Sequence, residues 1–238
     1  MDSNFNSLGL EGAGVIRSIG EDVRDLSLGD RVFFFGGGCF STGVISHAKL
    51  CVKIPDSLSF EEAAGMPTVF STVIRGVLDL GRLQSEETIL IHSACGGVGL
   101  AAIQIAKMIG AEIFCTVSNE EKINHLMENY GIPRNHIFQS RDSSFKDDVL
   151  EATKGRGVDI VLNSLSGELL HASWECVATF GRMIEIGKRD LIGNGKLALN
   201  VFELNRSYYG VDLGHLVEVR HGEANRYVFF LFIHVRGI

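Results

Sequence analysis

One segment, residues 88–102, constrains the fold of this 238-residue chain more than any other. An apolar run, Thr88–Ile91, leads into a turn of small residues, which opens into a second apolar run. Within the turn, Ser93, Gly96 and Gly99 have the spacing S-x-x-G-x-x-G, one substitution away from the dinucleotide-binding fingerprint. Small residues at these positions allow a sharp turn, a close approach of a pyrophosphate to the backbone, and tight packing of a helix on its strand. The segment therefore predicts a strand, a helix, and between them a turn that holds the pyrophosphate at the positive end of the helix dipole.

From Glu87 onward, strand-like and helix-like segments alternate, which predicts a parallel sheet covered by helices. Six strands are enough for a doubly wound sheet of the Rossmann type in an α/β fold. We expect strands near residues 88–92, 112–117, 136–138, 158–162, 181–186 and 207–211, and helices near 98–109, 120–129, 145–153 and 167–178.

The segments on either side follow different patterns. Glycines and short apolar runs over residues 8–60 predict a small β-rich unit of antiparallel strands. Ser59 and Glu62 form a capping box that begins a helix, and a second helix is expected over residues 68–80, after Pro67. Residues 217–238 do not continue the alternation; they predict either one added strand or a tail that packs against nothing.

Composition excludes several classes of protein. The net charge of −7 argues against a nucleic-acid partner, because a basic face is the usual footprint of such a protein. The five cysteines are scattered without a C-x-x-C pair, which indicates reduced thiols and a cytoplasmic location. There is no apolar signal segment near Met1 and no run long enough to span a bilayer, so no membrane partner is expected.

The end of the second strand predicts which dinucleotide binds. An NAD site carries an acidic residue about 20 positions past the glycines, and here the residues at that position, Thr116-Val117-Ser118, include no carboxylate. A hydroxyl from Ser118, an ammonium from Lys122 and a guanidinium from Arg141 suit the 2′-phosphate of NADPH instead. In an alternative interpretation, Ser118 and Glu121 form a capping box and Lys122 is a solvated helix residue.

Polar residues follow three of the later strands, where ligands bind in doubly wound sheets. Asn163 follows the strand over 158–162, Lys188 follows the strand over 181–186, and Asp212 follows the strand over 207–211. For any one of them alone, a helix cap or a solvated loop residue is the favoured interpretation. Their shared position at strand ends predicts a substrate site there.

Several of these motifs together resemble a known family. The segments at residues 8–14, 29–32, 92–104, 161–165 (VLNSL) and 185–188 (EIGK) resemble the enoyl reductase domains of polyketide synthases and of animal-type fatty acid synthases. Both belong to the medium-chain dehydrogenase/reductase superfamily. The likeness is strongest to the highly reducing fungal type and covers residues from about 8 to 216. It implies a partial GroES-like substrate domain over residues 1–66, an NADPH-binding Rossmann domain over 67–216, and an atypical tail over 217–238.

The resemblance also implies a reaction, NADPH-dependent reduction of a 2,3-unsaturated acyl thioester bound to an acyl carrier protein. The other domains of a synthase would be further partners, and a homodimer is left open. Lys188 and Asp212 match a proton-donating pair that acts on the substrate. The matching cofactor contacts are Ser93, Gly96, Gly97, Val98 and Gly99 at the pyrophosphate, Ser118, Lys122 and Arg141 at the adenosine phosphate, and Thr72 and Asn163 beside the nicotinamide.

Two departures from the superfamily pattern refine this expectation. Leu10 stands where the zinc-dependent alcohol dehydrogenases have a histidine ligand, and no four-cysteine lobe is present, so we expect no metal. Compared with the family, both ends of the chain are expected to be truncated. Two alternatives therefore stay open: a free-standing quinone or enone reductase of the same superfamily, and an NADPH-binding fragment without turnover.

Overall fold

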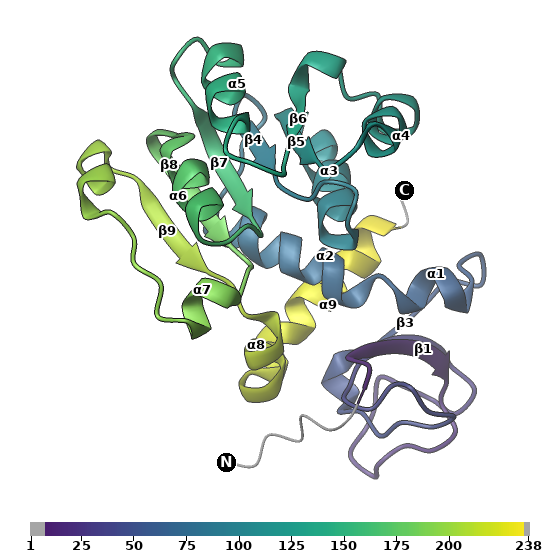
Figure 1. Ribbon diagram of the computed structural model, residues 1–238. Coiled ribbons are helices and arrows are strands. Elements are labelled where there is room, and N and C mark those ends of the chain that lie inside the picture. Colours follow the sequence, from purple (N-terminus) through teal and green to yellow (C-terminus); the bar gives the residue numbers. More distant parts are fainter. Residues whose placement is uncertain (1–7, 236–238) are drawn as a thin grey trace. The chain divides into compact units, whose positions relative to one another are not determined.

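The computed structural model describes residues 8–235, which fall into two compact units (Figure 1). The first, called the sheet unit below, is the continuous segment Val73–Val211. The second, called the split unit, combines the described residues up to Thr72 with those from Asp212 onward.

The sheet unit is built on six parallel strands in the order β6-β5-β4-β7-β8-β9. From β4 the chain runs outward through β5 and β6, and it then returns to the other side of β4 for β7, β8 and β9. This reversal makes the sheet doubly wound, so the predicted fold class is confirmed. The strands are β4 (Thr88–Ile91), β5 (Glu112–Val117), β6 (Ile137–Gln139), β7 (Val158–Asn163), β8 (Val177–Glu185) and β9 (Ser207–Gly210).

Helices cover both faces of this sheet. Right-handed crossovers that run in opposite directions from β4 put α3 and α4 on one face, and α5 and α6 on the other. The complete burial of Ile89, Leu90 and Ile91 on β4 follows from this double cover. The helical elements of the unit are η2 (Ile74–Leu80), α3 (Gly97–Ile109), α4 (Glu120–Tyr130), η3 (Arg134–His136), α5 (Phe145–Ala152), α6 (Glu168–Glu175), α7 (Arg189–Ile192) and η4 (Leu199–Leu204).

Two polar clusters, one partly buried and one fully buried, stabilise the sheet unit. The Arg182 guanidinium forms a two-pronged ion pair with Glu87 at 2.7 and 2.8 Å, and it also donates to the Gly81 carbonyl at 2.7 Å. His92 lies 2.9 Å from the hydroxyls of both Thr116 and Ser173. Because burial disfavours the imidazolium, the pKa of His92 is lowered to about 3, and the ring is neutral at pH 7.

The split unit contains an antiparallel sheet in the order β1-β2-β3, as the sequence predicts. The predicted capping box is also observed: Ser59 accepts from the Glu62 amide, and the Glu62 carboxylate accepts from the Ser59 amide. The elements are β1 (Glu11–Val15), β2 (Arg31–Phe35), η1 (Ala48–Leu50), β3 (Cys51–Lys53), α1 (Phe60–Ala64), α2 (Pro67–Val73), α8 (Leu213–Val219) and α9 (His221–Val235).

The end of the chain differs from both alternatives expected for it. Instead of a strand, residues 221–235 form the helix α9, which contacts η1 and β3 of the same unit. The Asn225 amide donates to the Lys49 carbonyl at 2.6 Å, and the His221 ring lies 4.6 Å from the His47 ring. Residues 223–235 contain no glycine or proline, which allows a helix, and packing against η1 and β3 stabilises it.

Two element boundaries also differ from expectation. The helix expected to reach residue 178 ends at Glu175, and β8 begins at Val177 rather than 181. An irregularity with Phe180 at a φ of 61° interrupts the strand pattern, so only its second half has a recognisable periodicity. The helix expected over 68–80 is observed, but its second half, η2, is a π-helix. Within residues 8–235 we find no helix that is both long and apolar enough to span a membrane.

Candidate dinucleotide and substrate site

The direction reversal of the sheet lies between β4 and β7, and this point defines the candidate site. In doubly wound sheets the crevice at the carboxyl ends of these two strands binds the ligand. Ser93 follows β4 and Ser164 follows β7, and their hydroxyls lie 3.1 Å apart. The predicted phosphate-binding turn is therefore positioned at the switch point of the sheet.

The turn itself is shaped to receive an anion. Ser93 has a φ of 53°, an uncommon conformation that directs the chain sharply out of β4. Helix α3 then begins at Gly97, with Gly96 as its N-cap residue. No side chain among the described residues caps this N-terminus. Gly96 and Gly97 are exposed, and the first N–H groups of this 13-residue helix have no partner within the helix. This arrangement fits the pyrophosphate of a dinucleotide.

Gly99 has a different role from Gly96, because it faces the protein. A β-carbon at residue 99 would lie 2.6 Å from both the Cα and the carbonyl oxygen of Ala94. Only glycine lets α3 approach the turn this closely. Val98, between Gly97 and Gly99, is partly buried.

The predicted adenosine contacts follow β5 and β6, which end side by side. Val117 pairs with Gln139, and the Ser140 amide donates to the Val117 carbonyl at 2.9 Å. Ser118 directly follows β5, and the exposed Arg141 lies two residues after β6. The structure thus brings these two residues to neighbouring strand ends.

Lys122 completes this set. Its ammonium donates to the Ser118 hydroxyl at 3.3 Å, and both groups are accessible to solvent. The alternative capping box of Ser118 with Glu121 is wrong, because Asn119 caps α4 by accepting from the Lys122 amide at 3.0 Å. Ser118 is therefore left to pair with Lys122. A role for Ser118, Lys122 and Arg141 in binding phosphate stays a prediction.

Asn163, at the end of β7, is fully buried. Its amide nitrogen donates to the Leu165 carbonyl at 2.8 Å and to the Glu185 carboxylate at 2.6 Å. Its amide oxygen accepts from the Leu165 N–H at 3.3 Å. These bonds shape the loop after β7, and contact of Asn163 with the nicotinamide stays a prediction.

Glu185 is a residue of this edge that sequence reasoning missed. It is the last residue of β8, and only 3% of it is exposed. Its two oxygens accept from the Gly187 amide at 2.6 Å and from Asn163, and the Tyr208 hydroxyl lies at 3.4 Å. Burial raises its pKa to about 7, against the smaller lowering effect of these hydrogen bonds. A carboxylate directly after the apolar pair Met183 and Ile184, at the end of β8, was the available signal.

The three remaining predicted residues are located as follows. Lys188 is exposed at the N-cap of α7 in the sheet unit. In the split unit, Asp212 is exposed and caps α8 by accepting from the His215 amide at 3.2 Å. Thr72 is 8% exposed, and its hydroxyl donates to the Thr68 carbonyl at 2.7 Å. Pairing of Lys188 with Asp212 stays a prediction.

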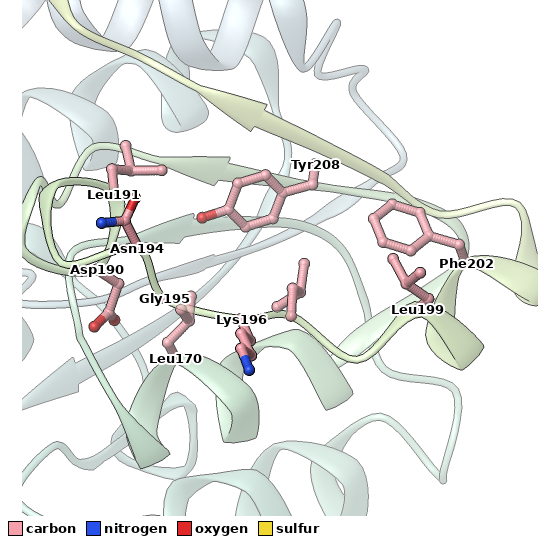
Figure 2. A pocket seen from close by; sticks show the side chains of 10 residues that line it. Leu170, Asp190, Leu191, Asn194, Gly195, Lys196, Leu199, Phe202 and Tyr208 are labelled. Carbon is pink, nitrogen blue, oxygen red and sulfur yellow. The ribbon is translucent and has the colours of Figure 1, made fainter.

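A pocket of about 530 Å³ lies in the sheet unit, beside this edge (Figure 2). Its wall is mainly apolar, and Figure 2 shows the Tyr208 hydroxyl pointing toward the end that holds Leu191 and Asn194. The pocket is lined by Leu170, Asp190, Leu191, Asn194, Gly195, Lys196, Leu197, Leu199, Phe202 and Tyr208.

Within the described part of the chain, no three His, Cys, Asp or Glu side chains are grouped as a metal site requires.

Comparisons with known families and proteins agree with this geometry. Residues 97–223 match the zinc-binding dehydrogenase family, and residues 5–56 match the alcohol dehydrogenase GroES-like domain. The chain is 58% identical over 209 residues to the highly reducing polyketide synthase gloL of Glarea lozoyensis, which is 87% of this chain. It is 56% identical over 223 residues to the highly reducing polyketide synthase ALT1 of Alternaria alternata, which is 93% of this chain. The chain spans about 8% of the length of each of these curated relatives.

Solved structures are similar over most of the fold. The CurK enoyl reductase matches with a TM-score of 0.86 and 34% identity, over 98% of this chain and 71% of that one. The nucleotide-binding subdomain of the enoylreductase domain of PpsC from Mycobacterium tuberculosis matches with a TM-score of 0.67 and 36% identity. That match covers 72% of this chain and 94% of the subdomain.

The doubly wound sheet, the glycine-containing turn at its switch point and the preceding GroES-like unit define an oxidoreductase of the medium-chain dehydrogenase/reductase superfamily, which takes a nicotinamide cofactor. Within that superfamily, the chain belongs to the enoyl reductase domains of polyketide synthases, and its curated relatives are highly reducing fungal synthases. The family resemblance predicted from the motifs is therefore confirmed.

Proposed function

We propose that this chain reduces a 2,3-unsaturated acyl thioester on a carrier protein, with NADPH and without zinc. The observation that carries the proposal is the carboxyl edge of the sheet. There the anion-binding turn at β4, the Ser118–Lys122 pair at β5 and Lys188 at β8 follow strands of one sheet. Leu10 in place of a histidine ligand supports the zinc-independent form.

The residues of the turn would hold the pyrophosphate of NADPH, and the cofactor would supply a hydride. Ser93, Gly96, Gly97 and Val98 present their backbone and small side chains at the start of α3, while Gly99 lets the helix approach the turn. Beyond the pyrophosphate, Ser118, Lys122 and Arg141 would bind the 2′-phosphate. Two cationic groups at this position favour NADPH over NADH, since the acid that binds a free ribose diol is missing.

Lys188 and Asp212 would act on the substrate. Addition of a hydride to the β-carbon of the enoyl thioester leaves an enolate, with negative charge on the thioester oxygen. A cationic donor at that oxygen stabilises the charge, and an acid must then deliver one proton to the α-carbon. We assign this proton donation to Lys188, supported by Asp212, and we assign Thr72 and Asn163 to the nicotinamide side of the site.

The synthase relatives support a carrier-bound substrate, because in such proteins the reductase is one domain among several. A second candidate, reduction of a free quinone, rests on a quinone oxidoreductase from Pseudomonas syringae. That structure matches with a TM-score of 0.78 and 26% identity, over 97% of this chain.

A paired spectrophotometric assay separates these candidates. The chain is supplied with NADPH and either crotonyl-pantetheine or a soluble quinone, and NADPH binding is titrated by fluorescence in parallel. We expect NADPH oxidation with the thioester. Turnover of the quinone alone would refute the thioester assignment, and NADPH binding without any turnover would identify a cofactor-binding fragment.

A further inference from the structure

The end of β8 contains a buried carboxylate whose partners are all at the carboxyl edge of the sheet. Glu185 contacts Asn163 of β7, Tyr208 of β9 and the backbone of its own loop at Gly187. One side chain thus connects three neighbouring strands, β7, β8 and β9. Burial of a carboxylate is costly unless its oxygens accept hydrogen bonds, and here both oxygens do.

These contacts bear directly on the position of Lys188. The ladder between β7 and β8 ends with the bond from the Ile186 amide to the Asn163 carbonyl at 3.0 Å. The next amide, that of Gly187, donates to Glu185 at 2.6 Å instead. One residue later the Lys188 carbonyl accepts from Ile192 at 2.9 Å and begins α7. The Glu185 carboxylate therefore fixes Gly187, the residue between the last bond of the strand ladder and Lys188.

Gly187 shows how closely the loop folds over this carboxylate. A β-carbon at residue 187 would lie 2.8 Å from a Glu185 oxygen. A side chain at this position would therefore displace the Glu185 oxygen and disturb the hydrogen bond that it accepts. Asn163 cannot turn its amide around to accommodate a changed partner, because its oxygen and nitrogen are both held by the backbone of Leu165.

The surroundings decide which charge state Glu185 adopts. The charged group that acts on Glu185 is Asp190 of α7, and its negative charge raises the pKa of Glu185. The other side chains that contact Glu185 are neutral: the Tyr208 hydroxyl and the Asn163 amide of β7. Since burial brings the pKa to about 7, Glu185 ionises as the pH rises through neutrality. The residues that α6 and η2 bury are uncharged: Leu170, Ala172, Ser173 and Trp174 on α6, and Ile74, Gly76 and Val77 on η2.

We propose that Glu185 is a positioning residue, which holds the Gly187 amide and thereby fixes Lys188 at the carboxyl end of β8. This inference rests on the proposed function, in which Lys188 donates the proton. Glu185 acts through the loop and does not itself contact the substrate.

The test uses Glu185→Gln, which keeps the shape of the side chain. It replaces one of the two accepting oxygens with an NH₂ donor, which then faces a group that donates to the carboxylate in wild type. We expect kcat with crotonyl-pantetheine to fall about tenfold, corresponding to about 1.4 kcal/mol, with the affinity for NADPH within about twofold of wild type. The exposed Glu203→Gln is the matched control, and its kcat should not change.

Two readouts separate positioning from a purely structural role. In a double-mutant cycle, Glu185→Gln should cost little further activity once Lys188 is alanine, because both changes remove the same contribution. In addition, the Gly187 amide proton should titrate in NMR spectra with a midpoint near pH 7, and this titration should disappear in Glu185→Gln.

The outcomes distinguish this inference from the proposed function. Wild-type turnover that Lys188→Ala lowers, combined with fully additive losses in the cycle, would overturn the role of Glu185 alone. A Gly187 amide proton with the same chemical shift in wild type and in Glu185→Gln would also overturn it, because the hydrogen bond to the carboxylate would then be absent. Absence of wild-type turnover, or an unchanged rate in Lys188→Ala, would refute the proposed function and with it the catalytic consequence for Glu185.

Discussion

Replacing Gly99 with alanine tests the packing that positions the phosphate-binding turn. The new β-carbon would lie 2.6 Å from the Cα and the carbonyl oxygen of Ala94, a distance that real β-carbons essentially never show. Both atoms belong to the backbone, so they cannot move aside as the end of a flexible side chain can. Either α3 or the turn must shift.

The magnitude follows from two opposing effects. Overpacking against a rigid neighbour costs about 3 kcal/mol, near the upper end of the usual range. Alanine is a better helix former than glycine by about 1 kcal/mol, so the net loss should be about 2 kcal/mol. In Gly96→Ala, the nearest atom is the Ser93 carbonyl oxygen at 3.2 Å, and we expect a loss below about 1 kcal/mol.

Urea unfolding followed by tryptophan fluorescence is a suitable assay. The single tryptophan, Trp174, is buried in the core of the sheet unit and reports on its unfolding. We expect the free energy of unfolding to be lower in Gly99→Ala than in Gly96→Ala and in wild type. A Gly99→Ala variant as stable as wild type would refute the argument that α3 contacts the turn too closely for a side chain.

Three further predictions concern binding and stability. Lys122→Ala should weaken NADPH binding about tenfold and leave NADH binding unchanged, whereas Lys107→Ala should change neither; equal losses for both cofactors would count against a phosphate contact. Arg182→Ala should lower the free energy of unfolding by about 3 kcal/mol, because Glu87 would be left partly buried without its partner; a loss below about 1 kcal/mol in urea unfolding would contradict this. His92 should make the fold less stable as the pH falls from 6.5 to about 3, because the unfolded chain takes up a proton that the native ring refuses. Over this range His92→Gln should have a shallower dependence of unfolding free energy on pH, and an unchanged slope would rule out this role.

The sequence predicts most of the sheet unit because its elements obey local rules. All six strands, including β4 and β5, begin and end within a few residues of their expected positions, apart from the first half of β8. Apolar periodicity and small turn residues are sufficient for these elements. In β8, the residue at a positive φ, Phe180, breaks the periodicity, and only the pairing of Val177 with Val158 establishes the strand.

The helices at the end of the chain depend on contacts that no local pattern contains. Residues 221–235 carry polar residues followed by an apolar run, which suits a strand as well as a helix. Contacts with η1 and β3, distant in sequence, decide between them. The same limit applies to the candidate site: Gly99 and the Ser118–Lys122 pair follow from spacing, whereas the contacts of Glu185 arise only when β7, β8 and β9 are aligned.

The proposed hydride transfer to the β-carbon is tested most directly by following the transferred hydrogen. Crotonyl-pantetheine is reduced by this chain with NADPH that carries deuterium at the reactive C4 position of the nicotinamide, and the butyryl product is analysed by NMR. We expect one deuterium at the β-carbon and a proton from solvent at the α-carbon. Deuterium at the α-carbon, or a product without deuterium, would contradict the proposed hydride transfer.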